Sequence, residues 1–337
     1  MTTTEQVLRT LEEHRGTPQS GETIAEGLQV SRTAVWKAVK SLREAGYDIC
    51  ASPKKGYYLP DTSDMLSKEA VEAQLAQIWP KEERQGRSLQ ILVEEEVTST
   101  NRELSALAID GAASGTVLIS GRQTSGKGHR DHHFSSPEGG LYMSILLRAE
   151  DLPYDRIAQM TASGALAVLR AVREVAGKAL TIRWVNDLYL DKKKVCGILT
   201  EGASDLESNQ LQWMVLGIGV NYRTKEEDYP LEIRSRITSL FPAGERGEKI
   251  PPRAKLAAQI IKELLQQPLD APELMRQYAQ DLDQKGEVVN VTPIRLGKEQ
   301  PQESYPAILR GVDEQMRLLV DVEGEQQALR FGQVSIS

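Results

Sequence analysis

The feature that most restricts the fold is a pair of helical segments near the N-terminus, separated by a very short turn. Residues 21–28 are predicted to form a short helix, and Ser31 then offers a side-chain oxygen of the kind that caps the start of a helix. A second helical pattern continues to Gly46, a residue type that commonly ends helices. Its apolar residues recur on one helix face: Val35, Val39 and Leu42. With a further helix over 4–14, this spacing predicts a helix-turn-helix.

A basic hairpin is expected directly after these helices. Residues 47–50 and 56–59 are β-like and flank the turn Ser-Pro-Lys-Lys, which completes the pattern of a winged helix that binds DNA. The second helix would enter the major groove, with its first residues near base edges and the lysines on phosphates. The alternative is an ordinary small domain whose basic residues are merely solvated. The predicted DNA-binding residues are Ser31, Arg32, Thr33, Trp36, Lys37, Lys40, Lys54 and Lys55.

Bulk properties set limits on the other classes of protein. At 337 residues several domains are expected, and no run of eighteen apolar residues could cross a bilayer. The N-terminus lacks the basic start and apolar stretch of a secretory signal, so we expect a cytoplasmic protein without membrane contact. The net charge of −7 excludes a basic coat, although residues 1–60 hold eight Lys and Arg against seven Asp and Glu. Cys50 and Cys196 lie too far apart in sequence, without ligand-like neighbours, to suggest a disulfide or a zinc site.

Hydrophobic periodicity divides the rest of the chain into a mixed α/β region and a β-rich tail. The fold class is therefore α+β and multidomain, with a central sheet covered by helices on one side and a small C-terminal β-barrel. The expected strands are 89–97, 115–123, 139–148, 180–190, 193–202 and 211–222, and the expected helices are 68–78, 101–111, 154–175, 253–267 and 271–281. The predicted domains are a winged helix at 1–62, a linker at 63–85, a catalytic domain at 86–284 and a β domain at 285–337.

A glycine-rich loop in the central region is the strongest candidate for an anion site. Residues 121–128 nearly match the phosphate-binding P-loop, but the final Ser or Thr is absent and no amphipathic helix follows. Glycines still allow backbone N–H groups to approach an anion, and basic residues surround them. The alternative is a flexible solvent loop. The nearby protonatable residues are Lys127, His129, Arg130, His132 and His133; a metal site made by the three histidines lacks a supporting carboxylate or cysteine, so no metal site is predicted.

Two further clusters are weak signals when each is taken alone. Residues 183–187 combine a cation, an amide and a carboxylate at the end of a strand, which a hairpin with an Asx turn would explain equally well. Residues 217–221 place glycines inside an apolar strand, which suggests that another group packs closely against the backbone.

Taken in order, the motifs resemble those of biotin protein ligases across nearly the full length, and the N-terminal winged helix makes the chain similar to the bifunctional class that also represses biotin genes. This resemblance implies a class II synthetase-like central domain and an SH3-like C-terminal barrel. The motifs are Thr98-Ser99-Thr100-Asn101, the loop 123–137, GGLYMS at 139–144, RWVNDLYL at 183–190, KKVCGIL at 193–199, LGIGVN at 216–221 and FGQVSIS at 331–337.

The resemblance implies an AMP-forming biotin–[biotin carboxyl carrier protein] ligase. Biotin and ATP would form biotinyl-5′-AMP with Mg²⁺, and a lysine of the carrier protein would then attack the mixed anhydride. Arg183, Lys127 and His129 would be catalytic, since cations stabilise the meeting of two anions. The implied biotin- and nucleotide-binding residues are Ser99, Thr100, Asn101, Gln123, Gly126, Lys127, Gly128, His129, Arg183, Asn186, Asp187, Gly197, Gly217, Gly219 and Asn221.

Departures from the family pattern leave a second interpretation open. The usual loop GRGRxGR is GKGHRDH here, KWPND is RWVND, the loop tryptophan is Phe134, and GEVS is GQVS. The loop therefore carries fewer side chains that are always positively charged. Arg183 stands where the family has a lysine, and this replacement is not conservative where a compact charge must fit. The alternative is therefore a ligase-impaired paralogue that senses biotin or another small acid and only regulates transcription.

The partners implied by the resemblance follow from both functions. They are a biotin carboxyl carrier protein domain, double-stranded operator DNA and a second copy of the chain in a ligand-induced homodimer. In that family the adenylate orders the loop and promotes pairing, so catalysis and repression would be coupled through one ligand.

Overall fold

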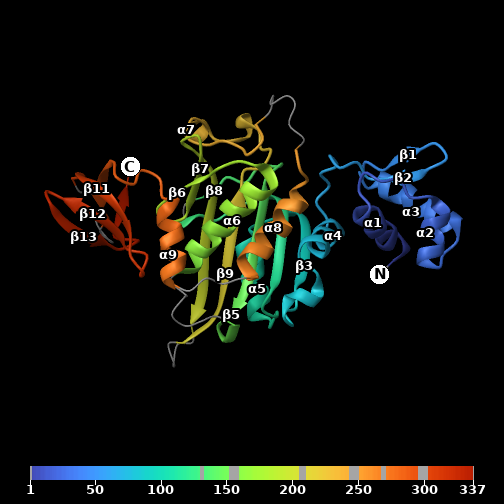
Figure 1. The fold of residues 1–337 in the computed structure, drawn as a ribbon, viewed down its shortest axis with the longest axis horizontal. Coiled ribbons are helices and arrows are strands. Elements are labelled where there is room, and N and C mark those ends of the chain that lie inside the picture. The colour runs from blue at the N-terminus through green and yellow to red at the C-terminus, as the bar shows by residue number, and fades with distance from the viewer. Residues whose placement is uncertain are drawn as a thin grey trace.

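The computed structural model describes residues 2–129, 133–151, 159–204, 210–242, 250–266, 271–294 and 303–336. Figure 1 shows three parts along the long axis: a small helical part with a hairpin at the N-terminal end, a sheet layered with helices in the middle, and a β part at the other end. Within these described residues, no helix is long and apolar enough to traverse a bilayer.

The N-terminal part is built as the winged-helix pattern predicts. Ser20 Oγ accepts a hydrogen bond from the Thr23 amide, and Ser31 Oγ accepts one from the Ala34 amide, so each helix of the helix-turn-helix is capped by serine. The helices and the hairpin enclose their own apolar core, which includes Val7, Leu11, Val35, Val39 and Leu59. The elements are α1 (Thr3–Glu13), α2 (Gly21–Leu28), α3 (Arg32–Glu44), β1 (Cys50–Ser52) and β2 (Gly56–Tyr58).

The segment after the wing is held to both neighbouring parts. Arg15 pairs with the buried Glu12 and donates to the Ser63 carbonyl over 2.8 Å. One residue on, Asp64 accepts from the Arg253 side chain at 2.9 Å. The connection is therefore ordered by two arginines, one from each side. Its elements are α4 (Lys68–Ile78) and the short helix η1 (Lys81–Arg84).

Seven strands among the described residues form the central sheet, in the order β3-β4-β5-β9-β8-β7-β6. Strands β3 and β4 are parallel, and the other neighbours are antiparallel. The strands are β3 (Gln90–Val97), β4 (Thr116–Gln123), β5 (Leu141–Arg148), β6 (Thr181–Arg183), β7 (Asp187–Leu190), β8 (Lys193–Ser204) and β9 (Leu211–Val220).

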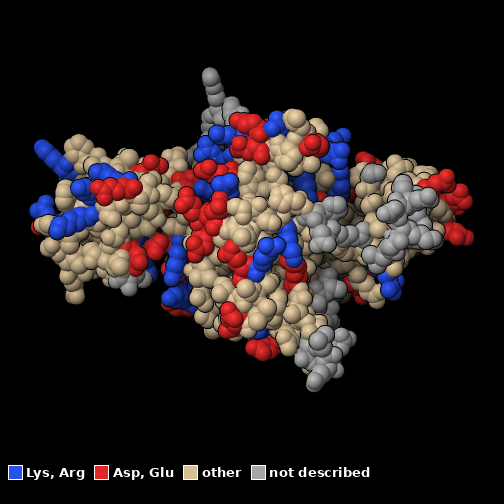
Figure 2. Space-filling model, turned by 180° about the vertical axis from the view of Figure 1, so that it is seen from behind, with Lys and Arg blue, Asp and Glu red and all other residues tan. Residues whose placement is uncertain are grey.

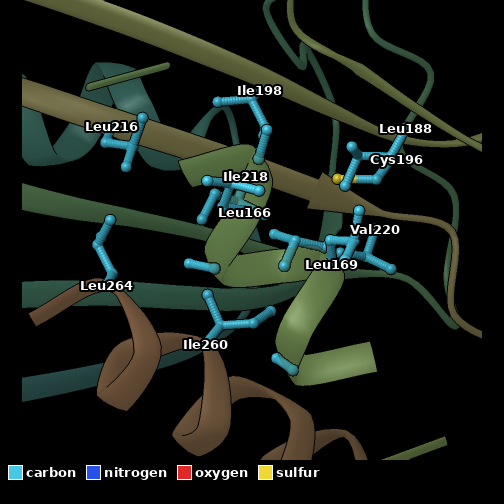
Figure 3. Packing of buried hydrophobic residues seen from close by; sticks show 14 of the residues in the cluster. Leu166, Leu169, Leu188, Cys196, Ile198, Leu216, Ile218, Val220, Ile260 and Leu264 are labelled. Carbon is cyan, nitrogen blue, oxygen red and sulfur yellow. The ribbon is translucent and has the colours of Figure 1, made fainter. Parts of the chain in front are cut away.

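One face of this sheet carries the main core. Leu166 and Leu169 of α6 (Met160–Ala176) and Ile260 of α8 (Arg253–Leu265) gather with Leu216 and Ile218 of β9 (Figure 3). The described part of α6 begins at Met160, and the earlier residues of the predicted helix, 154–158, lie outside the described residues. The remaining helices are α7 (Leu231–Arg234) and α9 (Ala271–Gln280), with short 3₁₀ helices at Ala149–Asp151 (η3) and Glu226–Asp228 (η5).

The expectation that helices cover only one side of the sheet is wrong. Helix α5 (Thr100–Ile109) packs on the opposite face, where Leu104 lies in a second core with Leu146, Trp213 and Val215. Strands that are apolar on both faces need cover on both, and a continuous apolar run such as 145–147 has no polar face that would reveal a solvated side. This second layer holds the N-terminus of α5 against the sheet.

The C-terminal part is an antiparallel β domain. Its strands follow the order β13-β12-β11-β10-β14, and within the described residues β13 and β14 stay at opposite edges, so this sheet is not closed into the expected barrel. Its contacts with the central part include two hydrogen bonds, in which Trp184 Nε1 donates to the Met316 carbonyl and Gln159 Nε2 donates to the Glu314 carbonyl. The strands are β10 (Val288–Pro293), β11 (Tyr305–Val312), β12 (Leu318–Val322), β13 (Glu325–Leu329) and β14 (Val334–Ile336).

Candidate functional site

A hollow of about 270 Å³ lies over the sheet at the N-terminus of α5, opposite the main core. Its wall combines the polar turn before α5, the glycine-rich loop and the central strands. The lining residues are Ser99, Thr100, Asn101, Gln123, Lys127, Gly128, His129, His133, Phe134, Asn186, Asp187, Lys194, Gly197, Ile198, Leu199, Gly217, Ile218 and Gly219. We refer to it as the first hollow.

Glycines make the floor of the first hollow. Side chains alternate between the two faces of a strand, so Gly217 and Gly219 of β9 face the hollow while Ile218 faces the core. A Cβ atom on Gly217 would lie 2.1 Å from Asn101 Oδ1, and one on Gly219 would lie 2.5 Å from Phe134 Cε1. The expectation that something packs against these glycines is confirmed, and the packed groups are protein side chains.

Asn101 is fixed at the floor by a hydrogen-bond network. Its Oδ1 accepts from Ser144 Oγ at 2.6 Å, and its Nδ2 donates to Glu201 Oε2 at 2.8 Å and to the Leu199 carbonyl at 3.3 Å. Ser144 Oγ also lies 2.8 Å from Thr100 Oγ1. The polar groups of this turn are therefore oriented before any ligand binds.

Gln123 joins the turn before α5 to the glycine-rich loop. Its Oε1 accepts from the Thr100 amide at 2.8 Å, and its Nε2 donates to Ser136 Oγ at 2.8 Å. Gly126 lies at this junction, and a Cβ there would approach the Phe134 carbonyl oxygen to 2.4 Å. The loop folds back on itself, since the Phe134 amide donates to the Gly126 carbonyl. Arg130, Asp131 and His132 lie outside the described residues.

Three basic residues of the motifs, Lys127, Lys194 and Arg183, are each held by a carboxylate. Lys127 Nζ lies 2.7 Å from Glu201, Lys194 Nζ lies 2.7 Å from Asp187, and Arg183 Nη2 lies 2.9 Å from Asp283. All are partly exposed, so a bound anion could share or displace these partners.

A second hollow adjoins the first, and the two share His129 and Asp187. Its volume is about 640 Å³. Aromatic contacts join the loop to the C-terminal domain here, with the rings of His129 and Phe331 4.4 Å apart between centroids and Trp184 edge-on to Phe331 at 5.8 Å. The other lining residues are Arg183, Tyr189, Arg236, Ile294, Gly332, Val334, Ser335 and Ile336.

Most of the predicted site residues meet at the first hollow, but three do not line it. Gly126 lies behind the loop, against the Phe134 carbonyl. Arg183 lines the second hollow, where its guanidinium carbon lies 3.9 Å from the centroid of the Tyr189 ring. Asn221 is buried and its Nδ2 donates to the Thr238 carbonyl, which ties the segment after β9 to the sheet.

Sequence reasoning missed several residues that shape the site, namely Ser144, Lys194, Leu199 and Glu201. The alternation of β8 carries a partial signal, because Gly197, Leu199 and Glu201 share one strand face. Ser144 faces the same side from β5, opposite Gly217 in the register.

Burial keeps two groups behind the site in their neutral forms. It raises the pKa of the Tyr142 phenol well above its ordinary value, and the hydroxyl donates to the Pro137 carbonyl at 2.8 Å. Burial likewise raises the pKa of the Cys196 thiol well above its ordinary value, with the nearby Asp187 carboxylate adding to the shift. Both groups therefore act as supports rather than as acids or nucleophiles.

The exposed face of the helix-turn-helix forms a separate, basic concavity. Arg32, Thr33 and Trp36 of α3 face Lys54 of the hairpin turn across it. Ser31 serves as the helix cap, and Lys37, Lys40 and Lys55 are exposed beside the concavity. Figure 2 shows Lys and Arg side chains projecting from this end of the molecule. Ser52 and Tyr57 also line it, although they were not among the predicted DNA-binding residues.

The chain matches the model of the biotin/lipoate A/B protein ligase family over residues 93–221 and an HTH domain over residues 3–58. It is 36% identical over 232 residues to the bifunctional ligase/repressor BirA of Bacillus subtilis, covering 68% of each chain. It is 29% identical to the Escherichia coli protein of the same name, covering 94% of this chain and 92% of that one. A biotin protein ligase from Aquifex aeolicus in complex with biotin and ATP superposes with a TM-score of 0.59 at 25% identity, over 74% of this chain and 98% of that one.

Proposed function

The chain belongs to the biotin/lipoate A/B protein ligase family, and on that premise we propose that it is a biotin protein ligase and a biotin-responsive repressor. It activates biotin with ATP to biotinyl-5′-AMP, releasing pyrophosphate. A lysine amine of a biotin carboxyl carrier protein then attacks the acyl carbon and AMP leaves. The winged helix binds operator DNA.

The observation that supports this function best is the pair of adjoining hollows that share His129 and Asp187. A reaction between a carboxylate and a nucleotide needs two ligands whose reacting ends meet. We assign biotin to the first hollow and ATP to the second. The reacting atoms would then meet beside His129, where positioning supplies much of the catalysis.

The residues of the first hollow suit a ligand with a polar head and an apolar body. Ser99, Thr100, Asn101 and Gln123 would contact the ureido group, and the glycine floor with Phe134 would hold the rest. Gly126, Gly128, Gly197, Gly217, Gly219, Asn186 and Asn221 shape or support this binding region.

We assign the positive charge at the reacting centre to Lys127, His129 and Arg183. His129 stands between the hollows, Lys127 is on the rim of the first, and Arg183 is in the second. These groups would stabilise negative charge that develops on the transferring phosphate.

Magnesium does not fit as a resident ion held by the protein. No group of three or more His, Cys, Asp or Glu side chains in the described part of the chain could hold a metal ion, and the Asp187 carboxylate is already paired with Lys194. We therefore propose that magnesium enters with ATP, since the ion is commonly bound through phosphate oxygens and water.

The remaining assignments follow from the two functions. We propose domain limits of 1–62, 63–85, 86–284 and 285–337, with an SH3-like C-terminal domain. Arg32, Thr33 and Trp36 would approach bases, and Lys37, Lys40, Lys54 and Lys55 would contact phosphates. A two-fold operator would be bound by a homodimer that forms with the adenylate, in the cytoplasm.

The test of the enzyme is pyrophosphate release from purified protein with biotin and magnesium-ATP, followed by biotin incorporation into a carrier domain. Operator binding with and without biotin and ATP tests the repressor. We expect both reactions and a rise in operator affinity with the two ligands. Absence of both reactions and of any effect of biotin on DNA binding would refute the proposal.

A second candidate, a regulator with impaired ligase activity, is favoured by the ion pairs of the site. Lys127, Lys194 and Arg183 each already have a carboxylate partner, which lowers the positive charge offered to two anionic substrates. In that case biotin and DNA would bind while no pyrophosphate is released.

A further inference from the structure

Arg236 lies on the wall of the second hollow, although it belongs to none of the sequence motifs. It follows the short helix α7, in the segment that connects β9 to α8. Its carbonyl accepts from the Lys194 amide at 2.8 Å, and the Lys194 carbonyl accepts from the Thr238 amide at 2.9 Å. These backbone bonds fix the segment against the start of β8, so the backbone of Arg236 is held at the hollow.

The Arg236 side chain is exposed and has no protein partner in the described part of the chain. Its guanidinium makes neither an ion pair nor a hydrogen bond with any described residue. Lys127, Lys194 and Arg183, in contrast, each have a carboxylate partner. Arg236 therefore offers its whole fork of N–H donors to a ligand.

The described side chains that line the second hollow give it positive charge. Arg183 and Arg236 are always protonated, and Asp187 is the one carboxylate among these lining residues. Asp187 is paired with Lys194, and Arg183 is paired with Asp283, so the charge of Arg236 is left uncompensated. A hollow charged in this way attracts a polyanion more strongly than an uncharged base or sugar.

The position of Arg236 indicates which part of a nucleotide it meets. His129 and Asp187 line both hollows, whereas Arg236 lines only the second. The α-phosphate of ATP must meet biotin where the hollows join, so Arg236 lies away from the bond that forms. The β- and γ-phosphates carry most of the negative charge of ATP, and their oxygens match the two parallel bonds that a guanidinium can donate.

We propose that Arg236 binds the β- and γ-phosphates of ATP in the second hollow. When a carboxylate oxygen of biotin bonds to the α-phosphorus, the bond from that phosphorus to the bridging oxygen breaks, and pyrophosphate leaves with the electron pair. Arg236 stabilises the charge on this leaving group. The inference rests on the proposed function, because it takes ATP as the occupant of the second hollow.

The experiment measures the dissociation constants of magnesium-ATP and of AMP by titration calorimetry on the full-length protein, without biotin. Arg236→Gln should raise the constant for ATP about tenfold, because a charged bond to phosphate is lost. The constant for AMP should change by less than about twofold, since AMP lacks both outer phosphates. Arg236→Lys keeps the charge but loses the fork, so the constant for ATP should rise about threefold. The affinity for biotin should not change in either variant.

Arg223→Gln is the matched control, because Arg223 is exposed in the same connection between β9 and α8 and lines neither hollow. Its dissociation constants for ATP and AMP should equal those of the wild type. Thermal unfolding checks that each variant is folded. The Arg236 variants should unfold at the wild-type temperature, since this side chain has no partner among the described residues.

An unchanged ATP affinity in Arg236→Gln would overturn the inference. An equal loss of affinity for ATP and AMP would also overturn it, because Arg236 would then serve the nucleoside or the fold. So would unchanged ATP binding with a loss of carrier biotinylation alone, which would place Arg236 against the carrier protein.

The proposed function can fail separately. If the wild type binds ATP but releases no pyrophosphate when biotin is added, the ligase function fails, and the comparison of ATP with AMP still decides the role of Arg236. If the wild type binds no ATP, both the function and the inference are overturned.

Discussion

Replacing Gly219 with alanine should weaken biotin binding while leaving the fold intact. The new methyl carbon would lie 2.5 Å from Phe134 Cε1 and 2.9 Å from Cζ, closer than carbon atoms approach without displacement. Gly219 is held within β9, paired to β5 on one side and to β8 on the other, so the backbone cannot retreat. The Phe134 ring must move, and it lines the hollow that the ligand needs.

The expected magnitude follows from overpacking. Inserting one methyl group into a filled space costs about 1–3 kcal/mol. Because Phe134 is only half-buried, the ring can swing into the open hollow, and most of that cost appears when a ligand enters. The dissociation constant for biotin should therefore rise about 5- to 140-fold, with little change in the free energy of unfolding.

Titration calorimetry with biotin measures the effect, and urea unfolding measures stability. Gly27→Ala is the control, because a Cβ on this glycine of α2 meets no atom within 4 Å. The double variant Gly219→Ala with Phe134→Leu should bind more tightly than Gly219→Ala alone, since the smaller side chain relieves the contact. Wild-type affinity in Gly219→Ala, or no recovery in the double variant, would refute this reasoning.

Three further predictions concern other parts of the chain. Lys54→Ala should lower the salt dependence of DNA binding by about one unit of log–log slope, measured by fluorescence anisotropy, whereas the exposed Lys225→Ala should not. Ellman's reagent should react in the native protein with the half-exposed Cys50 but not with the buried Cys196, whose pKa is raised by burial; rapid modification of both would contradict this. Burial raises the pKa of Glu12 above its ordinary value of 4.5, so native protein binds this proton more tightly than unfolded chain. The contribution of Glu12 to the free energy of unfolding should therefore fall as pH rises from 4.5 towards the raised pKa. In Glu12→Gln, the free energy of unfolding measured with urea at a series of pH values should lack this decrease.

Local patterns were sufficient to predict the winged helix. The serine cap, the apolar stripe of α3 and the basic hairpin are each encoded within a few residues, and the structure forms all three. The glycines inside the apolar run of β9 likewise indicated that another group packs closely against its backbone. Features of this kind depend on neighbours in sequence, which is why the sequence alone was informative.

Long-range pairings could not be predicted in the same way. Arg183 meets Asp283, one hundred residues later, and Asn101 meets Glu201 over the same separation. The alternation of β8 places Glu201 on the same strand face as Gly197 and Leu199, but nothing in the local sequence indicates that Asn101 is its partner. Periodicity also does not state which face of the sheet a helix will cover, and for that reason the position of α5 was predicted wrongly.

The contact between Asp64 and Arg253 has a practical consequence for anyone shortening the chain. Arg253 also donates to the Gly140 carbonyl, at the start of β5 and next to the loop residues that Tyr142 supports. A fragment that begins after residue 64 loses the carboxylate and leaves this arginine without its ionic partner beside the ligand loop. A ligase fragment without the winged helix should therefore start before Asp64, so that removal of the DNA-binding domain does not also disturb the site.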